Sequence, residues 1–232
     1  MAIFSNDTWM INALQEGQGD YFDYHLMPVA FPNILNEYAS VDDYKEKNPI
    51  AHKEDRTKCK AVVYGLAFGR QAPAIAQSLK MQTWEAQRII DNYMATATGF
   101  SQWREDIKEA GRKPAKRDLL INPFGRKFQS EVVTTKNYRN IEREALSFLP
   151  QSTSSDIMLA TIVRIYPTLE AAGYKVFNVV HDAAMLEGER EGADTVAQFI
   201  MQELRATGKA VLGDAVPFLS DYSYGKSWGD LS

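Results

Sequence analysis

The first half of the chain carries its hydrophobic residues mainly at helical spacing. Apolar side chains that recur every three or four positions are typical of amphipathic helices. Helices are predicted over residues 8–30, 54–66, 83–99 and 100–113. Pro28 interrupts the first of these, Thr83 is a candidate N-cap, and Gly99 and Gly111 are candidate ends. The pattern therefore predicts a mainly helical region up to about residue 125.

The pattern changes after about residue 117. Pro123 and Gly125 separate two apolar runs, which predicts a hairpin over 117–130. Helices follow at 137–149 and 154–173, and Ser154 or Ser155 can cap the second one. Its apolar stripe holds Met158, Ile162, Ile165, Tyr166 and Leu169.

Strands are predicted at the end of the chain as well. An apolar β-branched run at 175–180 reads as a strand, with a return strand after it and a third strand at 216–225. A helix from about Asp194 to Ala206, stopped by Gly208, lies between them. We therefore expect an α+β fold, in which region 1–125 is mainly helical and region 126–232 packs a small antiparallel sheet on helices, without a clear linker between the two regions.

Composition indicates a soluble globular protein. Hydrophobic residues make up 45% of the 232 positions, and no apolar run reaches the length of a membrane span. A single cysteine, Cys59, excludes a disulfide framework and favours a reducing compartment, hence the cytoplasm (the host cytoplasm if the source is viral). One cysteine and three separated histidines also make a zinc site a poor expectation.

Charge is unevenly distributed along the chain. The net charge of −4 argues against general polyanion binding, yet six basic residues and one acid lie between Arg112 and Lys127. Five basic residues and two acids lie between Lys53 and Arg70. Such segments indicate local phosphate contacts, with a solvated surface face as the alternative.

Two cationic and two aromatic residues, on the helix predicted at 54–66 and just beyond it, form a stripe along one helix face. Arg56, Lys60, Tyr64 and Phe68 recur every four positions, so they share one face. Neighbouring cations repel each other, and an anion would stabilise them. A triphosphate held by Arg56 and Lys60, with Tyr64 packed on the sugar or base, suits this pattern. Gly65 and Gly69 would let a base or backbone approach closely. An ordinary helix with a wet basic edge is the alternative.

A second feature is the acid at the end of the strand run, in "KVFNVVHDAAM". Asp182 follows the apolar residues directly, after His181. A hairpin turn or a metal site would explain it, and a catalytic metal site would normally need a second carboxylate.

Taken together, these motifs resemble family A DNA polymerases of the bacterial polymerase I type. The pattern R-x3-K-x3-[FY]-G-x2-[YF]-G is matched by Arg56, Lys60, Tyr64, Gly65, Phe68 and Gly69. "FGRKFQ" is similar to the family's basic hairpin, and "EREALSFLPQSTSSDIM" to its E-R-x-A…Q-G-T-x-x-D stretch, with Ser152 in place of Gly. "VVHDAAM" resembles the V-H-D-E hairpin, with Ala183 in place of Glu, and "GKSWGD" resembles the G-x-x-W ending.

The resemblance implies template-directed DNA synthesis. A primer 3′-hydroxyl would attack the α-phosphate of a deoxynucleoside triphosphate, helped by two Mg²⁺ ions. The fold would be a fingers subdomain at 1–125 followed by the C-terminal part of a palm subdomain at 126–232. The motifs' divergence is typical of phage proteins.

The resemblance also assigns roles to individual residues. Asp182 would be a catalytic metal ligand, and Lys60 would bind the triphosphate and donate a proton to the leaving group. The remaining nucleotide-binding residues would be Arg56, Tyr64, Phe68 and Gly69. DNA-binding residues would be Arg143, Gln151, His181 and Arg126.

The family's second catalytic carboxylate is missing from the 232 residues. It lies in a D-Y-S-x-x-E-x-R stretch that this sequence lacks. Asp7, Asp20 and Asp23 are possible substitutes, but they read as surface or capping acids. We expect a polymerase split over two chains, with the second Asp supplied by a separate N-terminal chain; a truncated gene model and a decayed fragment are the alternatives. Without that chain, little or no activity is expected.

Two other functions compete with the polymerase. A non-catalytic nucleic-acid-binding module that keeps the polymerase shape is favoured slightly by Ala183 and Ser152. A relative of single-subunit RNA polymerases is disfavoured by the pair Tyr64–Gly65.

Overall fold

The structure is a computed structural model that describes residues 1–15, 21–180 and 182–230. It divides into two compact units. Unit 1 holds Met1–Ile121 and Arg126–Pro150, and unit 2 holds Asn122–Gly125 and Gln151–Ser232. Unit 1 is helical and unit 2 combines helices with an antiparallel pair of strands, which confirms the α+β class.

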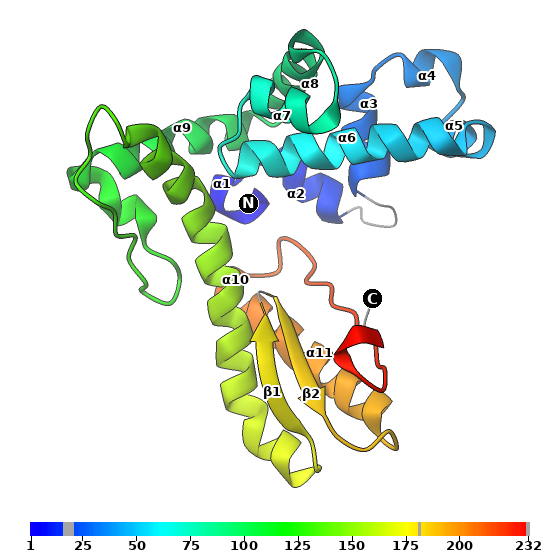
Figure 1. The fold of residues 1–232 in the computed structure, drawn as a ribbon, viewed down its shortest axis with the longest axis vertical. Coiled ribbons are helices and arrows are strands. Elements are labelled where there is room, and N and C mark those ends of the chain that lie inside the picture. The colour runs from blue at the N-terminus through cyan, green and yellow to red at the C-terminus, as the bar shows by residue number, and fades with distance from the viewer. Residues whose placement is uncertain (16–20, 181, 231–232) are drawn as a thin grey trace. The chain divides into compact units, whose positions relative to one another are not determined.

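Unit 1 is a succession of helices (Figure 1). In chain order these are α1 (Ala2–Ser5), α2 (Thr8–Gln15), the π-helix η1 (Phe22–Leu26), α3 (Met27–Ala30), α4 (Ile34–Glu37), α5 (Val41–Lys47), α6 (Pro49–Ala67), α7 (Ala72–Leu79), α8 (Thr83–Thr96), α9 (Thr98–Arg112) and the 3₁₀ helix η2 (Pro114–Leu120). The first part of α10 (Tyr138–Ala171) belongs to the same unit.

Helix α6 is buried along one side by α7 and α8. Val62 and Leu66 of α6, Ile75 of α7, and Ile89 and Tyr93 of α8 are all less than 3% exposed. Figure 1 shows α7 and α8 along the same side of α6. Burying this much apolar surface holds α6 rigidly, so the opposite side of the helix has a defined orientation for binding.

Two predicted helix boundaries in unit 1 are wrong. Gln82, not Thr83, caps α8, and it forms a capping box with Glu85. Gly99 does not end α8 but lies inside α9, where the lack of a side chain has a packing reason: a Cβ there would be 2.9 Å from the Asp7 Cα. The N-cap residue of α9, Ala97, makes no side-chain hydrogen bond to the helix. Asp7 takes over this role, because its Oδ2 accepts a hydrogen bond from the Phe100 amide at 2.9 Å.

The two helices predicted at 137–149 and 154–173 are one continuous helix, α10 (Tyr138–Ala171). Ser154 and Ser155 therefore lie within the helix and cap nothing. Pro150 costs the helix one backbone hydrogen bond. Buried side chains on both sides of it, Leu149 and Thr153, are 4% and 1% exposed. This packing offsets the lost bond and keeps the helix intact.

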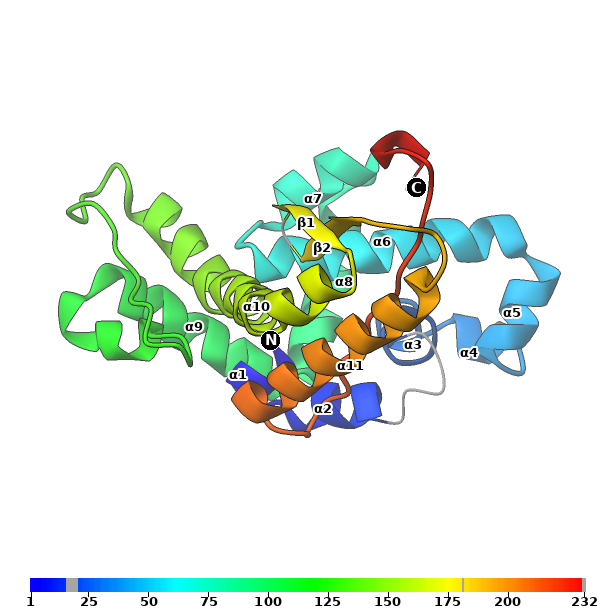
Figure 2. The same ribbon diagram turned by 90° about the horizontal axis from the view of Figure 1, so that it is seen from below.

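Unit 2 is a hairpin packed on two helices. Strands β1 (Lys175–Val180) and β2 (Ala183–Glu187) are antiparallel, with Val180 opposite Ala183 and an irregularity between Val176 and Asn178. The later part of α10 and helix α11 (Ala193–Leu212) pack on this hairpin (Figures 1 and 2).

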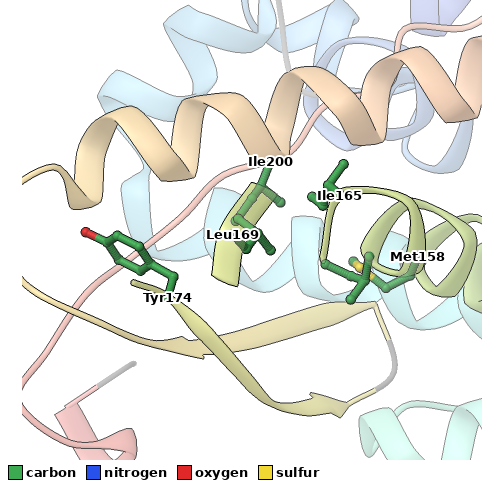
Figure 3. Close-up of a cluster of buried hydrophobic side chains, with 6 residues drawn as sticks. Met158, Ile165, Leu169, Tyr174 and Ile200 are labelled. Atoms are coloured by element: carbon green, nitrogen blue, oxygen red, sulfur yellow. The ribbon is translucent and has the colours of Figure 1, made fainter. Parts of the chain in front are cut away.

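The core of unit 2 joins these four elements (Figure 3). Its buried members are Met158, Ile162, Ile165, Leu169, Tyr174 and Ile200. The predicted stripe of α10 is confirmed except for Tyr166, which is 40% exposed. The predicted core face of α11 is confirmed as well, since Val196, Phe199, Ile200 and Leu204 all belong to this cluster.

Two predictions at the end of the chain are wrong. Gly208 lies inside α11, because the Phe218 ring occupies the space of a side chain, 2.7 Å from an added Cβ. The helix ends instead at Gly213, where φ is 77°. Residues 216–225 form no strand in the described part of the chain. Side-chain contacts hold this segment against α11: the Phe218 ring packs at Gly208, and Tyr222 donates a hydrogen bond to Asp194 Oδ1. A short 3₁₀ helix, η3 (Trp228–Asp230), follows. Within the described ranges, no helix combines the length and apolar character needed to cross a bilayer.

Candidate nucleotide- and DNA-binding site

The predicted stripe lies on the side of α6 that the core does not cover. Tyr64 is 54% exposed and Phe68, just past the helix end, is 39% exposed. Lys60 and Arg56 are half-buried and lie one and two turns before Tyr64, respectively. The structure therefore brings two cations and two aromatic rings together along one accessible face, as their spacing predicts.

Arg56 has a protein carboxylate next to it. Its Nε lies 3.0 Å from Oδ1 of Asp23, which sits on η1 and whose side chain is only 8% exposed. The same Oδ1 lies 3.3 Å from Nε2 of the buried His52. Neither contact to this oxygen is an aligned hydrogen bond, so the attraction is mainly electrostatic. Asp23 is thus a buried, paired acid, and the expectation of a surface or capping role is wrong for it.

The space beside each of the two motif glycines is occupied by another side chain of the protein. A Cβ on Gly65 would lie 2.9 Å from Cδ1 of the buried Ile75, so Gly65 serves the packing of α7 on α6. A Cβ on Gly69, where φ is 74°, would lie 2.6 Å from Cγ of Arg143. The predicted space for a base at Gly65 is therefore occupied by Ile75, and Gly69 brings the predicted DNA contact Arg143 to the end of the stripe.

The end of α6 is also held from α9. Nε of Arg104 donates to the Leu66 carbonyl at 3.3 Å, and this satisfies one of the last carbonyls of the helix. Arg104 is 8% exposed, and burial lowers its pKa below the usual arginine value. Phe68 and Gly69 therefore follow a helix end that is fixed on two sides.

Much of the basic segment 112–127 is neutralised by the protein's own acids. Lys113 and Lys116 each lie 2.6 Å from a carboxylate oxygen of Glu109, and their hydrogen bonds lower the pKa of Glu109 to about 2. Arg112 pairs with Glu142 at 3.2 Å. Arg126 and Lys127, at the other end of the segment, are exposed, and their phosphate contacts stay a prediction.

Arg126 follows a tight turn rather than a long hairpin. Ile121 and Lys127 form a single antiparallel bridge, and the Gly125 amide donates to the Asn122 carbonyl at 2.8 Å. The buried Asn122 fastens the turn to α10 by donating to Oδ2 of Asp156 at 2.7 Å. It also donates to Ser152 Oγ at 3.2 Å. Gln151, the residue before Ser152, is exposed on α10.

Asp182 lies in the β1–β2 turn, and its side chain is exposed. The predicted hairpin is confirmed, since Val180 and Ala183 are paired across the turn. His181, predicted to lie near a primer end, falls outside the described residues. Asp182 and Gln151 belong to unit 2, whereas the α6 stripe, Arg126 and Arg143 belong to unit 1.

The carboxylates described do not form a magnesium site by themselves. Over residues 1–15, 21–180 and 182–230, no three His, Cys, Asp or Glu are grouped to hold a metal ion. Asp7 is buried with both oxygens engaged, by the amides of Met10 at 2.8 Å and Phe100 at 2.9 Å. This confirms a capping role for Asp7 and removes it, like the paired Asp23, as a substitute ligand. Asp20 lies outside the described residues. Mg²⁺ in nucleotide sites is bound by one or two carboxylates together with waters and phosphates, and Asp182 offers one exposed carboxylate.

Comparison with known proteins identifies the family. The model of DNA polymerase family A matches residues 1–230. The chain belongs to DNA polymerase family A. Among curated relatives, the thermostable DNA polymerase I of Thermus aquaticus is 28% identical over 178 residues, which are 75% of this chain and 20% of that protein. DNA polymerase I of Chloroflexus aurantiacus is 26% identical over 184 residues, 78% of this chain and 19% of the relative.

A solved structure shares the fold of this family A chain. It is the POL domain of Pol1 from M. smegmatis, in complex with DNA primer-template and dNTP. The TM-score is 0.77 at 23% identity, and the match covers 98% of this chain and 37% of that one. The chain thus spans about a fifth of the length of the curated relatives quoted above.

Sequence reasoning missed the partners that hold the family A motif residues. Asp23 and His52 lie 33 and four positions before Arg56, and no periodic pattern links Asp23 to that helix. Asn122 could have been found, because Asn before Pro is a common turn start. Its attachment to Asp156, 34 positions later, is a tertiary contact that local patterns do not contain.

Proposed function

We propose that this chain takes part in template-directed DNA synthesis, as one portion of a family A polymerase that transfers a nucleotidyl group from a dNTP to a primer 3′-hydroxyl. The observation that carries the proposal is the α6 stripe. In a chain that matches the family model over residues 1–230, the two cations and two aromatic residues of the motif lie on the accessible face of a rigid helix.

The stripe suits a nucleoside triphosphate. Lys60 provides a compact charge on a flexible stem, suited to phosphate oxygens and to protonating the leaving pyrophosphate. Arg56, one turn earlier, provides a planar fork for phosphate oxygens. Tyr64 and Phe68 offer exposed ring faces for the sugar and the templating base, with Gly69 beside them.

Primer-template DNA is the second proposed ligand. Arg143 and Gln151 are exposed on α10, and Arg126 is exposed after the Asn122–Gly125 turn. Cations and amides of this kind bind phosphate and sugar oxygens. His181 completes the proposed set at the primer end.

We propose Asp182 as one metal ligand for Mg²⁺, with the other carboxylate supplied from outside these 232 residues. Its exposed position between β1 and β2 supports the role. In this proposal the chain's own residues bind nucleotide and DNA. Catalysis requires the second carboxylate as well, because the described acids do not complete a metal site.

A surface on unit 2 supports assembly with further polymerase segments. Leu159, Val163 and Tyr166 recur at helical spacing on the outer side of α10 and are 43%, 73% and 40% exposed. Phe177 on β1 is 52% exposed. An isolated two-stranded hairpin is marginally stable, so additional cover would stabilise this unit.

The test is primer extension with purified chains. The 232-residue chain is assayed alone and with the polypeptide from the same source that carries a D-Y-S-type carboxylate motif. We expect little extension alone and clear extension by the pair. Absence of extension by a pair that binds primer-template would contradict the proposal, and robust extension by the single chain would contradict the shared metal site.

Cytoplasmic location and phage origin stay predictions.

A non-catalytic, polymerase-shaped DNA-binding module is the second candidate. The lack of a complete metal group among the described residues favours it. Asp182→Ala separates the two functions: an enzyme loses extension in the assembled pair while DNA binding stays nearly unchanged, whereas a binding module loses nothing.

A further inference from the structure

The two neighbouring cations of the α6 stripe predict an anionic partner, and for Arg56 the protein itself provides one. Asp23 places a carboxylate beside Arg56, the first cation of the stripe. We propose that Asp23 is a positioning residue for triphosphate binding: it holds the Arg56 guanidinium in place so that the stripe presents it to the phosphates. This inference rests on the proposed nucleotide-binding role of α6.

The position of Asp23 favours such a role. It lies on η1, a π-helix of five residues that packs against α6. π-Helical turns are uncommon and occur often at functional sites. The side chain is 8% exposed whereas that of Arg56 is 26% exposed, so the acid lies beneath a cation that reaches the surface.

The electrostatics bind the two side chains together. A buried carboxylate is costly unless it is paired, and leaving it unpaired costs more than the pair contributes. Asp23 has two cationic or polar partners from one face of α6, Arg56 and His52, four residues apart. His52 is itself fixed, because its ring meets the Tyr44 ring edge-on at 6.0 Å. Asp23 therefore cannot easily turn away, and it attracts Arg56 to a defined place.

The contact uses a suitable part of the arginine. Asp23 approaches Nε, which is one of five N–H donors in the fork. Holding Nε limits rotation of the guanidinium plane, and a preorganised fork loses less entropy when phosphate binds.

The test measures tripolyphosphate binding to the 232-residue chain by isothermal titration calorimetry without metal. Asp23→Asn removes the charge at constant size, and we expect binding to weaken about fivefold. Asp43→Asn, which breaks an exposed pair with Lys47 on α5, is the matched control and should leave binding unchanged. Unchanged or tighter binding by Asp23→Asn would overturn the proposal.

A double-mutant comparison tests whether Asp23 acts through Arg56. In the Arg56→Ala background, Asp23→Asn should have no further effect on binding. The same fivefold loss in both backgrounds would indicate a general structural role and overturn the proposal. If Asp23→Asn fails to fold, Asp23→Glu takes its place, since it keeps the charge but displaces it. Weaker binding by Asp23→Glu supports positioning, and unchanged binding refutes it.

The wild-type titration separates this inference from the proposed function. If the wild-type chain does not bind tripolyphosphate, the nucleotide-binding role of the stripe fails. If the wild type binds and Arg56→Ala weakens binding but Asp23→Asn does not, only the positioning role fails.

Discussion

Gly69 and Arg143 are in contact at the end of helix α6. A Cβ on Gly69 would lie 2.6 Å from Cγ and 3.2 Å from Cα of Arg143. The two residues are 74 positions apart in the sequence, and both lie in stretches that resemble family A motifs. The contact joins the C-terminal end of the predicted nucleotide-binding stripe to the first part of α10.

Gly69→Ala should lower the stability of unit 1 by more than the strain of placing alanine at a positive φ. A non-glycine residue at φ 74° costs about 1 kcal/mol, and forcing Arg143 aside adds about 1–3 kcal/mol. Gly173→Ala is the matched control, because Gly173 follows α10 at φ 82° with nothing within 4 Å of an added Cβ. Urea denaturation followed by circular dichroism compares the two. Equal losses would contradict the close contact.

Gly65→Ala should destabilise the packing of α7 on α6, and Ile75→Val should recover part of the loss. The added Cβ meets Cδ1 of Ile75 at 2.9 Å, and valine lacks that atom. Overpacking of this kind costs about 1–3 kcal/mol. The free energies of unfolding of the two single variants and the double variant give the coupling. Additive losses would show that Ile75 does not fill the space at Gly65.

Cys59 should be unreactive in the folded chain. Burial, with smaller contributions from Asp55 and Asp23, raises the pKa of its thiol to about 12. Only the thiolate attacks disulfide reagents, so labelling by DTNB at pH 8 should be slow until urea unfolds the chain. The unfolded thiol loses its proton near pH 9, whereas the folded thiol keeps it. This group's contribution to stability should therefore fall between about pH 9 and 12. Rapid native labelling would contradict the buried position.

Lys60→Ala should weaken dTTP binding about tenfold, since it removes one of the two cations that we propose bind the triphosphate. Lys58→Ala is the charge-matched control, because Lys58 lies on the same helix and pairs with Asp55 at 2.8 Å. Fluorescence titration of both variants with dTTP provides the comparison. Equal weakening would mean that net charge, and not the stripe, attracts the nucleotide.

Local patterns predicted the elements better than their ends. The apolar spacing in Met158, Ile162, Ile165 and Leu169 located the core face of α10, and the β-branched run located β1. The ends at Gly99 and Gly208 were wrong because both glycines make room for a distant side chain, which the local sequence does not contain.

The same limit applies to the candidate site. The spacing of Arg56, Lys60 and Tyr64 predicted an accessible face on one helix, and the structure has that face on α6. The carboxylate beside Arg56 could not be predicted, because Asp23 reaches it through tertiary packing of η1 on α6.

Primer extension by Asp182→Asn tests the central claim most directly. The variant chain is combined with the polypeptide proposed to supply the second carboxylate. Asp214→Asn, which alters an exposed acid paired with Lys209, is the control. We predict that Asp182→Asn lowers the extension rate at least about a thousandfold, while primer-template affinity is unchanged and the control extends normally. Normal extension by Asp182→Asn would contradict the assignment of this chain to the catalytic centre of a polymerase.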